Sequence, residues 1–199
     1  MILGVIPARL NSTRFPSKVI FPLKGKPIIE HVYEKALQSN LLNKVIVAVD
    51  SEETKNVINC QNIIMTSDKH QSGTDRVAEV ANNFNCDIVV NIQGDEPGID
   101  PLLIDKLIQL FEDPDVEMAS IASTDLKEDD LNNDNVVKVN LDKENNAISF
   151  IRNNLNPEST YYRHIGIYAY RKNTLNLFTS LTQSDNEKNH RLEQLRALD

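Results

Sequence analysis

The chain has 199 residues, 40% of them hydrophobic and 25% charged, and a formal net charge of -8. This length fits one domain with a well-formed core, or a main domain with a small lobe. The acidic balance disfavours nucleic acids and anionic membrane surfaces as partners, because both repel negative charge. No apolar run approaches the roughly 20 residues that span a bilayer, and residues 1–5 lead into a short strand and not into a secretory leader. Two cysteines without metal-type spacing fit thiols in a reducing compartment, so we expect a cytoplasmic protein.

The first half of the chain alternates short apolar runs with amphipathic segments. Strands are predicted over 2–6, 44–49, 63–65 and 87–92, and helices over 27–39, from 51 onward, over 74–84 and over 101–111, with a turn at 23–26. This order predicts an α/β fold, in which a mostly parallel sheet carries helices on both faces. Such sheets bind ligands beyond the carboxyl ends of their strands, which is where segments 7–18 and 93–97 fall.

The second half has a different pattern. Strands are predicted over 118–123, 136–140, 147–151 and 164–170, and a final helix from about 186 to the end. Segment 125–135 is acidic and rich in asparagine, which indicates a loop or a frayed helix. Segment 153–160 has turn chemistry and is expected to form a flap. We therefore expect a single domain over 1–199 with a small, more antiparallel lobe at about 130–170.

The loop after the first strand holds three cations, Arg9, Arg14 and Lys18, together with hydroxyl residues. Phosphates need fixed cations and backbone donors, since their charge is costly to hold otherwise. The loop has neither the Gly-x-x-x-x-Gly-Lys-Ser/Thr pattern of kinases and GTPases nor the Gly-x-Gly-x-x-Gly pattern of dinucleotide sites. The alternative for this segment is a solvated basic loop.

Two further segments could bind ligands. Gln93-Gly94-Asp95-Glu96-Pro97 places carboxylates at a strand end, beside a glycine that lets a ligand approach the backbone. One or two carboxylates suit Mg²⁺, which takes its other ligands from water and phosphates; a turn with solvated acids is the alternative. Segment 70–76 leads into a helix, where free amides favour an anion, although Ser72 or Thr74 could serve only as a cap.

Taken together, six segments resemble the bacterial CMP-Kdo synthetases, the 3-deoxy-manno-octulosonate cytidylyltransferases. They are Ile-Pro-Ala-Arg-x-x-Ser-Thr-Arg-x-Pro-x-Lys at 6–18, His-Gln-Ser-Gly-Thr-Asp-Arg at 70–76, Asn-Ile-Gln-Gly-Asp-Glu-Pro at 91–97, Val-Val-Lys-Val at 136–139, His-Ile-Gly-Ile-Tyr at 164–168 and Leu-Glu-Gln-Leu-Arg at 192–196. They span nearly the whole chain. The resemblance implies a Rossmann-like fold of the nucleotide-diphospho-sugar transferase type.

The resemblance also implies an activity and a set of roles. CTP and the sugar acid Kdo would give CMP-Kdo and pyrophosphate for lipopolysaccharide synthesis, in a magnesium-dependent homodimer that pairs through the smaller lobe. Arg9, Lys18 and Asp95 would be the catalytic groups, with Asp95 as the metal ligand. CTP would bind at Pro7, Ala8, Arg9, Lys18, Ser72, Gly73 and Gln93. The sugar acid would bind at Arg14, Arg76, Arg152, His164, Glu193 and Gln194.

This sequence departs from the family pattern in two places. Ile151 stands where a serine usually precedes the arginine that matches Arg152, and the segment from there to His164 is short, with a more polar flap. The family continues past the Leu-Glu-Gln-Leu-Arg segment to an aspartate that completes the metal site, whereas these 199 residues end at Asp199, so this is either a shortened form or one that lacks the ligand. Two alternatives follow: a cytidylyltransferase for another sugar acid, such as sialic acid or an amino-Kdo, or a non-catalytic nucleotide or sugar binder.

Overall fold

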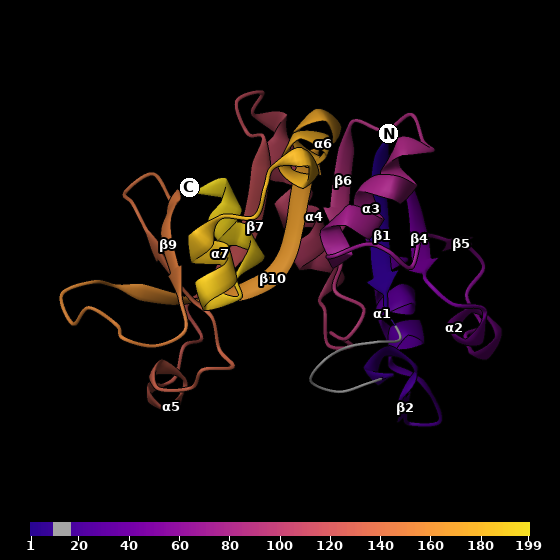
Figure 1. Ribbon diagram of the computed structural model, residues 1–199, viewed down its shortest axis with the longest axis horizontal. Helices are drawn as coiled ribbons and strands as arrows, with labels where there is room; N and C mark the ends of the chain where they lie inside the picture. The colour runs from indigo at the N-terminus through magenta and orange to yellow at the C-terminus, as the bar shows by residue number, and fades with distance from the viewer. Residues whose placement is uncertain (10–16) are drawn as a thin grey trace. The chain divides into compact units, whose positions relative to one another are not determined.

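The computed structural model of the protein describes residues 1–9 and 17–199 (Figure 1). These residues form two compact units. The first consists of residues 1–119 and 167–179, and the second of residues 120–166 and 180–199. The small lobe expected at about 130–170 falls mainly in the second unit, which also includes the C-terminal residues.

The first unit is built on a parallel sheet. Strands β1 (Ile2–Ala8), β4 (Lys44–Val49), β5 (Ile63–Met65) and β6 (Ile88–Asn91) lie in the order β5-β4-β1-β6, and all three pairings are parallel. The end of β10 (Tyr161–Arg171) pairs antiparallel with β6. The predicted mostly parallel sheet is therefore confirmed, and so are its four strands, to within two residues at each end.

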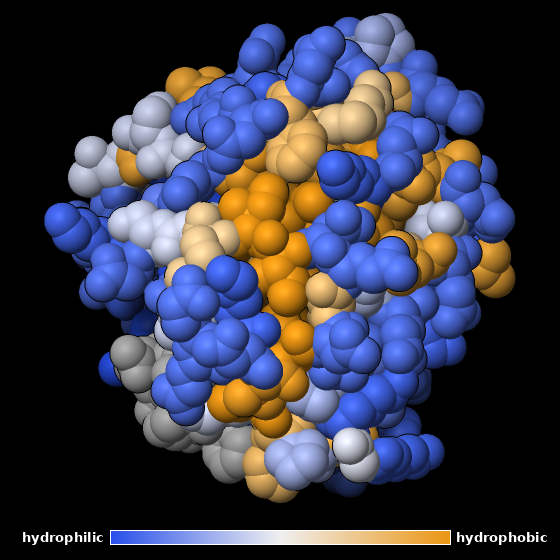
Figure 2. Space-filling model, turned by 90° about the vertical axis from the view of Figure 1, so that its right-hand side faces the viewer, coloured by the Kyte–Doolittle hydropathy of each residue, from blue (hydrophilic) through white to orange (hydrophobic). Residues whose placement is uncertain are grey.

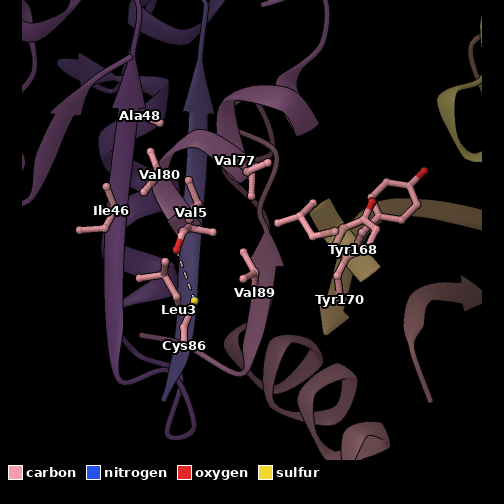
Figure 3. Packing of buried hydrophobic residues seen from close by; sticks show 13 residues of the cluster. Leu3, Val5, Ile46, Ala48, Val77, Val80, Cys86, Val89, Tyr168 and Tyr170 are labelled. Atoms are coloured by element: carbon pink, nitrogen blue, oxygen red, sulfur yellow. Dashed lines mark hydrogen bonds between the residues drawn. The ribbon is translucent and has the colours of Figure 1, made fainter. Parts of the chain in front are cut away.

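Helices cover both faces of this sheet, as predicted. Figure 3 shows Leu3 and Val5 of β1 packed in one cluster with Val77 and Val80, which come from α3 (Gly73–Asn82). Successive side chains of a strand point to opposite faces. Accordingly, Ile6 lies on the other face, where its side chain and that of Ile29 from α1 (Ile28–Ala36) both approach Gly94. That face also carries α4 (Pro101–Gln109), which contacts both β6 and α1.

The helix start signals operate largely as the sequence indicates. Ser51 caps α2 (Glu52–Val57) by accepting a hydrogen bond from the Thr54 amide at 3.1 Å. Pro101 is the first residue of α4, which a short 3-10 turn extends over Leu110–Glu112. Pro27 lies one position outside α1 and not within it. The capping pattern therefore fixes where these helices begin.

The turn predicted at 23–26 is a tight hairpin between β2 (Pro22–Leu23) and β3 (Lys26–Pro27). Its two central residues have positive φ, 50° at Lys24 and 89° at Gly25. Such turns match the right-handed twist of the paired strands, and glycine adopts a positive φ without a steric penalty. The hairpin follows a 3-10 turn at Lys18–Ile20 and leads directly into α1.

The second unit is antiparallel, as expected. Strand β8 (Lys138–Leu141) pairs antiparallel with β9 (Ala147–Ile151) and with the first part of β10. Strand β7 (Met118–Ser123) also pairs with β10. Segment 125–135 contains only one helical turn, α5 (Glu128–Leu131). A small apolar cluster of Val139, Phe150, Leu192 and Leu195 joins the strands to the C-terminal residues.

In the last thirty residues one helix was not predicted and one prediction was wrong. No helix was predicted after β10, yet α6 (Lys172–Ser180) forms there, because Leu175 and Phe178 supply one buried face and Phe178 packs against Tyr170. The single final helix predicted from 186 is two shorter elements. Helix α7 (Asp185–His190) ends where Arg191 takes a left-handed φ of 53°, and the 3-10 segment η3 (Glu193–Ala197) follows.

Figure 2 shows the side of the molecule on which Figure 1 places α2 and β5, with apolar side chains exposed between polar ones. Strand β5 is the edge of the sheet, and Met65 on it and Val57 at the end of α2 are exposed.

Across the described ranges, 1–9 and 17–199, none of the helices has the length and apolar character that a bilayer crossing requires.

Candidate active site

The candidate site lies where the strand order of the first unit reverses. The chain passes from β1 to β4 and β5 on one side, and then crosses back to β6 on the other side of β1. The crevice at the carboxyl ends of two such strands is the usual ligand site of an open parallel sheet. Lys18 follows β1, and Gln93 and Asp95 follow β6. The topology therefore brings the two segments singled out in the sequence to one place.

Pro7, near the end of β1, is where two glycine-containing segments meet. A Cβ atom added to Gly94 would lie only 2.9 Å from the carbonyl oxygen of Pro7, and one added to Gly73 would lie 3.5 Å from the Pro7 ring. Backbone just after β6 and at the start of α3 thus approaches the same residue. Gly94 is required here because any side chain would push against main-chain atoms.

Arg9 links segment 70–76 to the site. Its Nη1 donates to the carbonyl oxygen of Gln71 at 3.0 Å. The next residue, Ser72, caps α3 by accepting from the Asp75 amide at 3.1 Å, while its own amide donates to the Asp75 carboxylate at 2.9 Å. This is a reciprocal capping box. The hydroxyl of Ser72 therefore has a structural partner, while its neighbours Gln71 and Gly73 lie against Arg9 and Pro7.

Lys18 and Asp95 form the charged centre of the site. The Nζ atom of Lys18 lies 2.7 Å from Oδ2 of Asp95, and the side chains are 43% and 39% exposed. Both groups are therefore accessible to a ligand. Among the described residues no three His, Cys, Asp or Glu side chains gather as a metal cage. One accessible carboxylate beside a cation of the kind that can bind phosphate still fits Mg²⁺, which takes few protein ligands when phosphates accompany it.

Arg76 is fully buried on α3, where its guanidinium contacts other groups of the protein. Its Nη1 donates to the Thr66 hydroxyl and to the Ser67 carbonyl oxygen, and its Nη2 donates to Asp50 at 3.2 Å. Burial lowers the pKa of the guanidinium, and the charge of Asp50 opposes that shift. Arg76 thus anchors the loop before α3. Arg14, also predicted to bind the sugar acid, lies outside the described residues.

The other predicted sugar-acid residues belong to the second unit. The Nε2 atom of His164 lies 2.8 Å from the Ser120 hydroxyl, and its ring and that of Phe150 meet in a T-shaped arrangement with 4.9 Å between ring centroids. Burial lowers the pKa of His164 to about 4. The imidazole is therefore neutral at neutral pH, suited to exchange hydrogen bonds and not to serve as a cation.

Arg152 follows β9 and donates from Nη1 to the Asp134 carbonyl oxygen at 2.8 Å. The fully buried Lys138 donates its ammonium group to the carbonyl oxygens of Arg152 and Asn133. Burial lowers the pKa of Lys138, and the nearby carboxylates of Asp134 and Asp130 oppose this. Lys138 thus fixes the backbone from which the Arg152 side chain extends.

Glu193 and Gln194 open η3, where Gln194 is buried and Glu193 is half-buried. Leu192 and Leu195 on either side pack in the same cluster as Phe150, which contacts His164. One small apolar core therefore supports two of the predicted sugar-acid segments of this unit.

Sequence reasoning missed Ser120, Lys138 and Asp50, each of which contacts a predicted site residue. Ser120 lies within β7 and Asp50 directly follows β4, and nothing in the local pattern marks either residue. Lys138 did carry a signal, since a lysine between valines on a strand is unusual and buried lysines are rare unless they are paired.

The comparisons with known proteins agree with this arrangement. A family model described as cytidylyltransferase matches residues 3–199. The 3-deoxy-manno-octulosonate cytidylyltransferase of Pelobacter propionicus is 40% identical over all of this chain and 85% of its own length. That of Thermodesulfovibrio yellowstonii is 41% identical over 98% of this chain and 85% of its own length.

A solved structure of CMP:2-keto-3-deoxy-manno-octonic acid synthetase complexed with CTP is also similar, at 36% identity and a TM-score of 0.91. The match covers 99% of this chain and 85% of that one. A cytidylyltransferase from Leptospira borgpetersenii, at 17% identity and a TM-score of 0.63, shares the fold. The fold, the paired segments at the sheet switch point and these matches lead to one conclusion: the chain belongs to the 3-deoxy-manno-octulosonate cytidylyltransferase family, a family of nucleotidyltransferases.

Proposed function

We propose that this protein transfers the cytidylyl group of CTP to 3-deoxy-manno-octulosonate, giving CMP-Kdo and pyrophosphate. The observation that carries the proposal is the Lys18–Asp95 pair at the switch point between β1 and β6. A cation suited to phosphates and a carboxylate suited to a divalent metal lie together there. The relatives that match all or nearly all of this chain are named 3-deoxy-manno-octulosonate cytidylyltransferases.

The nucleotide site of the proposal lies in the first unit. Pro7 and Ala8 end β1 and Arg9 follows it, Ser72 caps α3 and Gly73 begins it, and Gln93 follows β6. Arg9 and Lys18 would neutralise the triphosphate, and the backbone around Gly73 and Gly94 lets a ligand approach closely. Asp95 would hold Mg²⁺, which when bound would offset charge on the phosphates.

The sugar-acid site of the proposal uses Arg152, His164, Glu193 and Gln194 of the second unit, with Arg14. The acceptor carries a carboxylate, which an arginine can bind through two parallel hydrogen bonds. His164, neutral and held by Ser120, would exchange hydrogen bonds with sugar hydroxyls. Arg76 is buried, so we assign it a positioning role at the loop before α3.

In the proposed reaction the anomeric hydroxyl oxygen of the sugar acid attacks the α-phosphorus of CTP. The new oxygen–phosphorus bond forms as the bond to the β-phosphate oxygen breaks, and pyrophosphate leaves with that electron pair while the hydroxyl proton is lost to solvent. The chain contributes by holding both reactants in line and by neutralising charge. We also propose a cytoplasmic homodimer, paired through the second unit, that serves lipopolysaccharide synthesis.

The experiment is a pyrophosphate-release assay with CTP, Mg²⁺ and a panel of sugar acids. We expect turnover to be greatest with 3-deoxy-manno-octulosonate. Equal or better turnover with sialic acid or an amino-Kdo would reassign the acceptor, which the polar segment 153–160 makes worth testing. CTP binding that ignores Mg²⁺, with no product from any acid, would identify a non-catalytic binder. Light scattering tests the dimer.

A further inference from the structure

The C-terminal turn that carries Glu193 and Gln194 is held by a buried ion pair. Arg196 donates from Nε to Glu187 Oε2 at 2.8 Å and from Nη2 to Glu187 Oε1 at 2.6 Å. Both side chains are only 5% exposed. Two parallel hydrogen bonds between a guanidinium and a carboxylate fix orientation as well as distance. The pair therefore sets how η3 lies against α7.

The backbone between these two residues reverses sharply. Helix α7 ends at His190, Arg191 is left-handed, and Leu192 is extended before η3 begins. The Leu192 amide donates to the Glu187 carbonyl oxygen at 3.2 Å, and the Leu192 and Leu195 side chains pack into the cluster with Val139 and Phe150. Apolar packing thus holds one side of η3, and the Glu187–Arg196 pair holds the other.

Arg196 also faces Glu193. Its Nη2 atom lies 3.8 Å from Glu193 Oε1, while the Glu193 side chain is 31% exposed. One guanidinium therefore stands between two carboxylates, one fully engaged and buried, the other reaching the surface. Attraction at this distance keeps the Glu193 carboxylate on the Arg196 side of the turn, and burial makes that attraction stronger than it would be in water.

We propose that Glu187 and Arg196 are positioning residues for the binding of the sugar acid, acting through Glu193 and Gln194. This inference rests on the proposed function, which assigns Glu193 and Gln194 to that substrate. Stability alone accounts poorly for such a pair, because a buried ion pair can often be replaced by apolar residues without loss of stability. What apolar residues cannot replace is the fixed orientation of the guanidinium toward Glu193.

The experiment compares the unaltered chain with the double variant E187M/R196M, which removes both charges and keeps an apolar filling. We expect the melting temperature to stay close to that of the unaltered chain. We expect kcat/KM for the sugar acid to fall on the order of 10- to 100-fold, as for other small misplacements of binding groups, while KM for CTP is unchanged. An unaltered sugar-acid kcat/KM, or an equal loss for both substrates, would make the pair purely structural and overturn the inference.

Two single variants complete the design. Lys188→Met removes the exposed ion pair with Asp185 on the same helix, and it should change neither substrate constant. Arg196→Lys retains the charge but cannot form the fork, so a smaller and selective loss for the sugar acid is expected. If the double variant does not fold, Arg196→Lys decides by the same criterion. A selective loss of kcat/KM for the sugar acid supports the inference, and an equal loss for both substrates overturns it. Turnover by the unaltered chain tests the proposed function separately.

Discussion

The Nζ atom of Lys18 lies 2.7 Å from Oδ2 of Asp95, although the two residues are 77 positions apart in the chain. A group assigned to phosphates and a group assigned to a metal neutralise each other when neither ligand is present. Each side chain is about two fifths exposed, so the pair itself is weak, on the order of 1 kcal/mol or less. A triphosphate with its metal can therefore separate it at little cost.

Lys18→Met should weaken CTP binding. The variant removes the charged hydrogen-bond donor that the proposed function assigns to the phosphates, and such a bond is worth roughly 1.5–3 kcal/mol, or about 10- to 150-fold in the dissociation constant. Titration calorimetry with CTP measures it. Lys24→Asn is the matched control, because it removes a lysine charge from an exposed turn at a φ of 50° that asparagine tolerates. Equal CTP affinity in both variants would show that Lys18 is only a solvated surface residue.

The same substitution should have the opposite effect on a metal ion added without nucleotide. Once Lys18 no longer competes for Asp95, Mn²⁺ should bind a few-fold more tightly, as expected for the loss of an ion pair worth up to about 1 kcal/mol. Electron paramagnetic resonance of free Mn²⁺ gives the dissociation constant. In the unaltered chain, CTP should increase the affinity for Mn²⁺ by a comparable factor. A metal affinity that CTP and Lys18→Met both leave unchanged would contradict this competition.

Asp95→Asn should remove the dependence of CTP affinity on Mg²⁺. An amide keeps the shape of the side chain but lacks the charge that a hard divalent cation requires. Calorimetric titrations of CTP with and without Mg²⁺ should then give the same affinity. Glu96→Gln, the equivalent change at the adjacent exposed carboxylate, should retain the dependence. If only Glu96→Gln abolished the dependence of CTP affinity on Mg²⁺, the metal ligand would be Glu96 and not Asp95.

Gly94→Ala should damage the nucleotide site directly. The added Cβ would lie 2.9 Å from the Pro7 carbonyl oxygen, a main-chain atom that cannot move away freely. Such overpacking costs about 1–3 kcal/mol of the free energy of unfolding, and it should also raise the KM for CTP because the proposed nucleotide site includes Pro7. Gly98→Ala has no atom within 4 Å of its added Cβ and serves as the control. Thermal melts and initial rates compare the two variants. Similar melting temperatures and similar KM values for CTP in both would contradict the close approach of Gly94 to Pro7.

His164 should make stability depend on pH in the acid range. Burial lowers its pKa to about 4, from an ordinary value of 6.5. Between these values the unfolded chain binds a proton at this residue and the folded chain does not. The free energy of unfolding should therefore decrease as pH falls from 6.5 toward 4, by up to about 1.4 kcal/mol per pH unit from this group. His164→Gln, compared by urea unfolding at several pH values, should reduce that slope, whereas the exposed His190→Gln should not.

The sequence by itself determined the elements that short apolar runs and helix-capping residues mark. Strands β4, β5, β7 and β9 have the predicted bounds, because short apolar runs between turn residues have few alternatives. Ser51 and Pro101 marked helix starts through local hydrogen bonding and backbone geometry. The six matching segments also indicated the family, since each keeps its chemistry within a few consecutive residues.

Only the tertiary structure decided what depends on contacts between distant segments. The meeting of Pro7 with Gly73 and Gly94, the burial of Arg76 against Asp50, and the hold of Lys138 on Arg152 involve partners far apart in the chain. Helix α6 and the break at Arg191 escaped prediction because contacts between successive elements, the packing of Phe178 against Tyr170 and the Glu187–Arg196 pair, override weak local preferences. Local sequence fixes local geometry, whereas the position of a charge relative to its partners is set by how the elements pack.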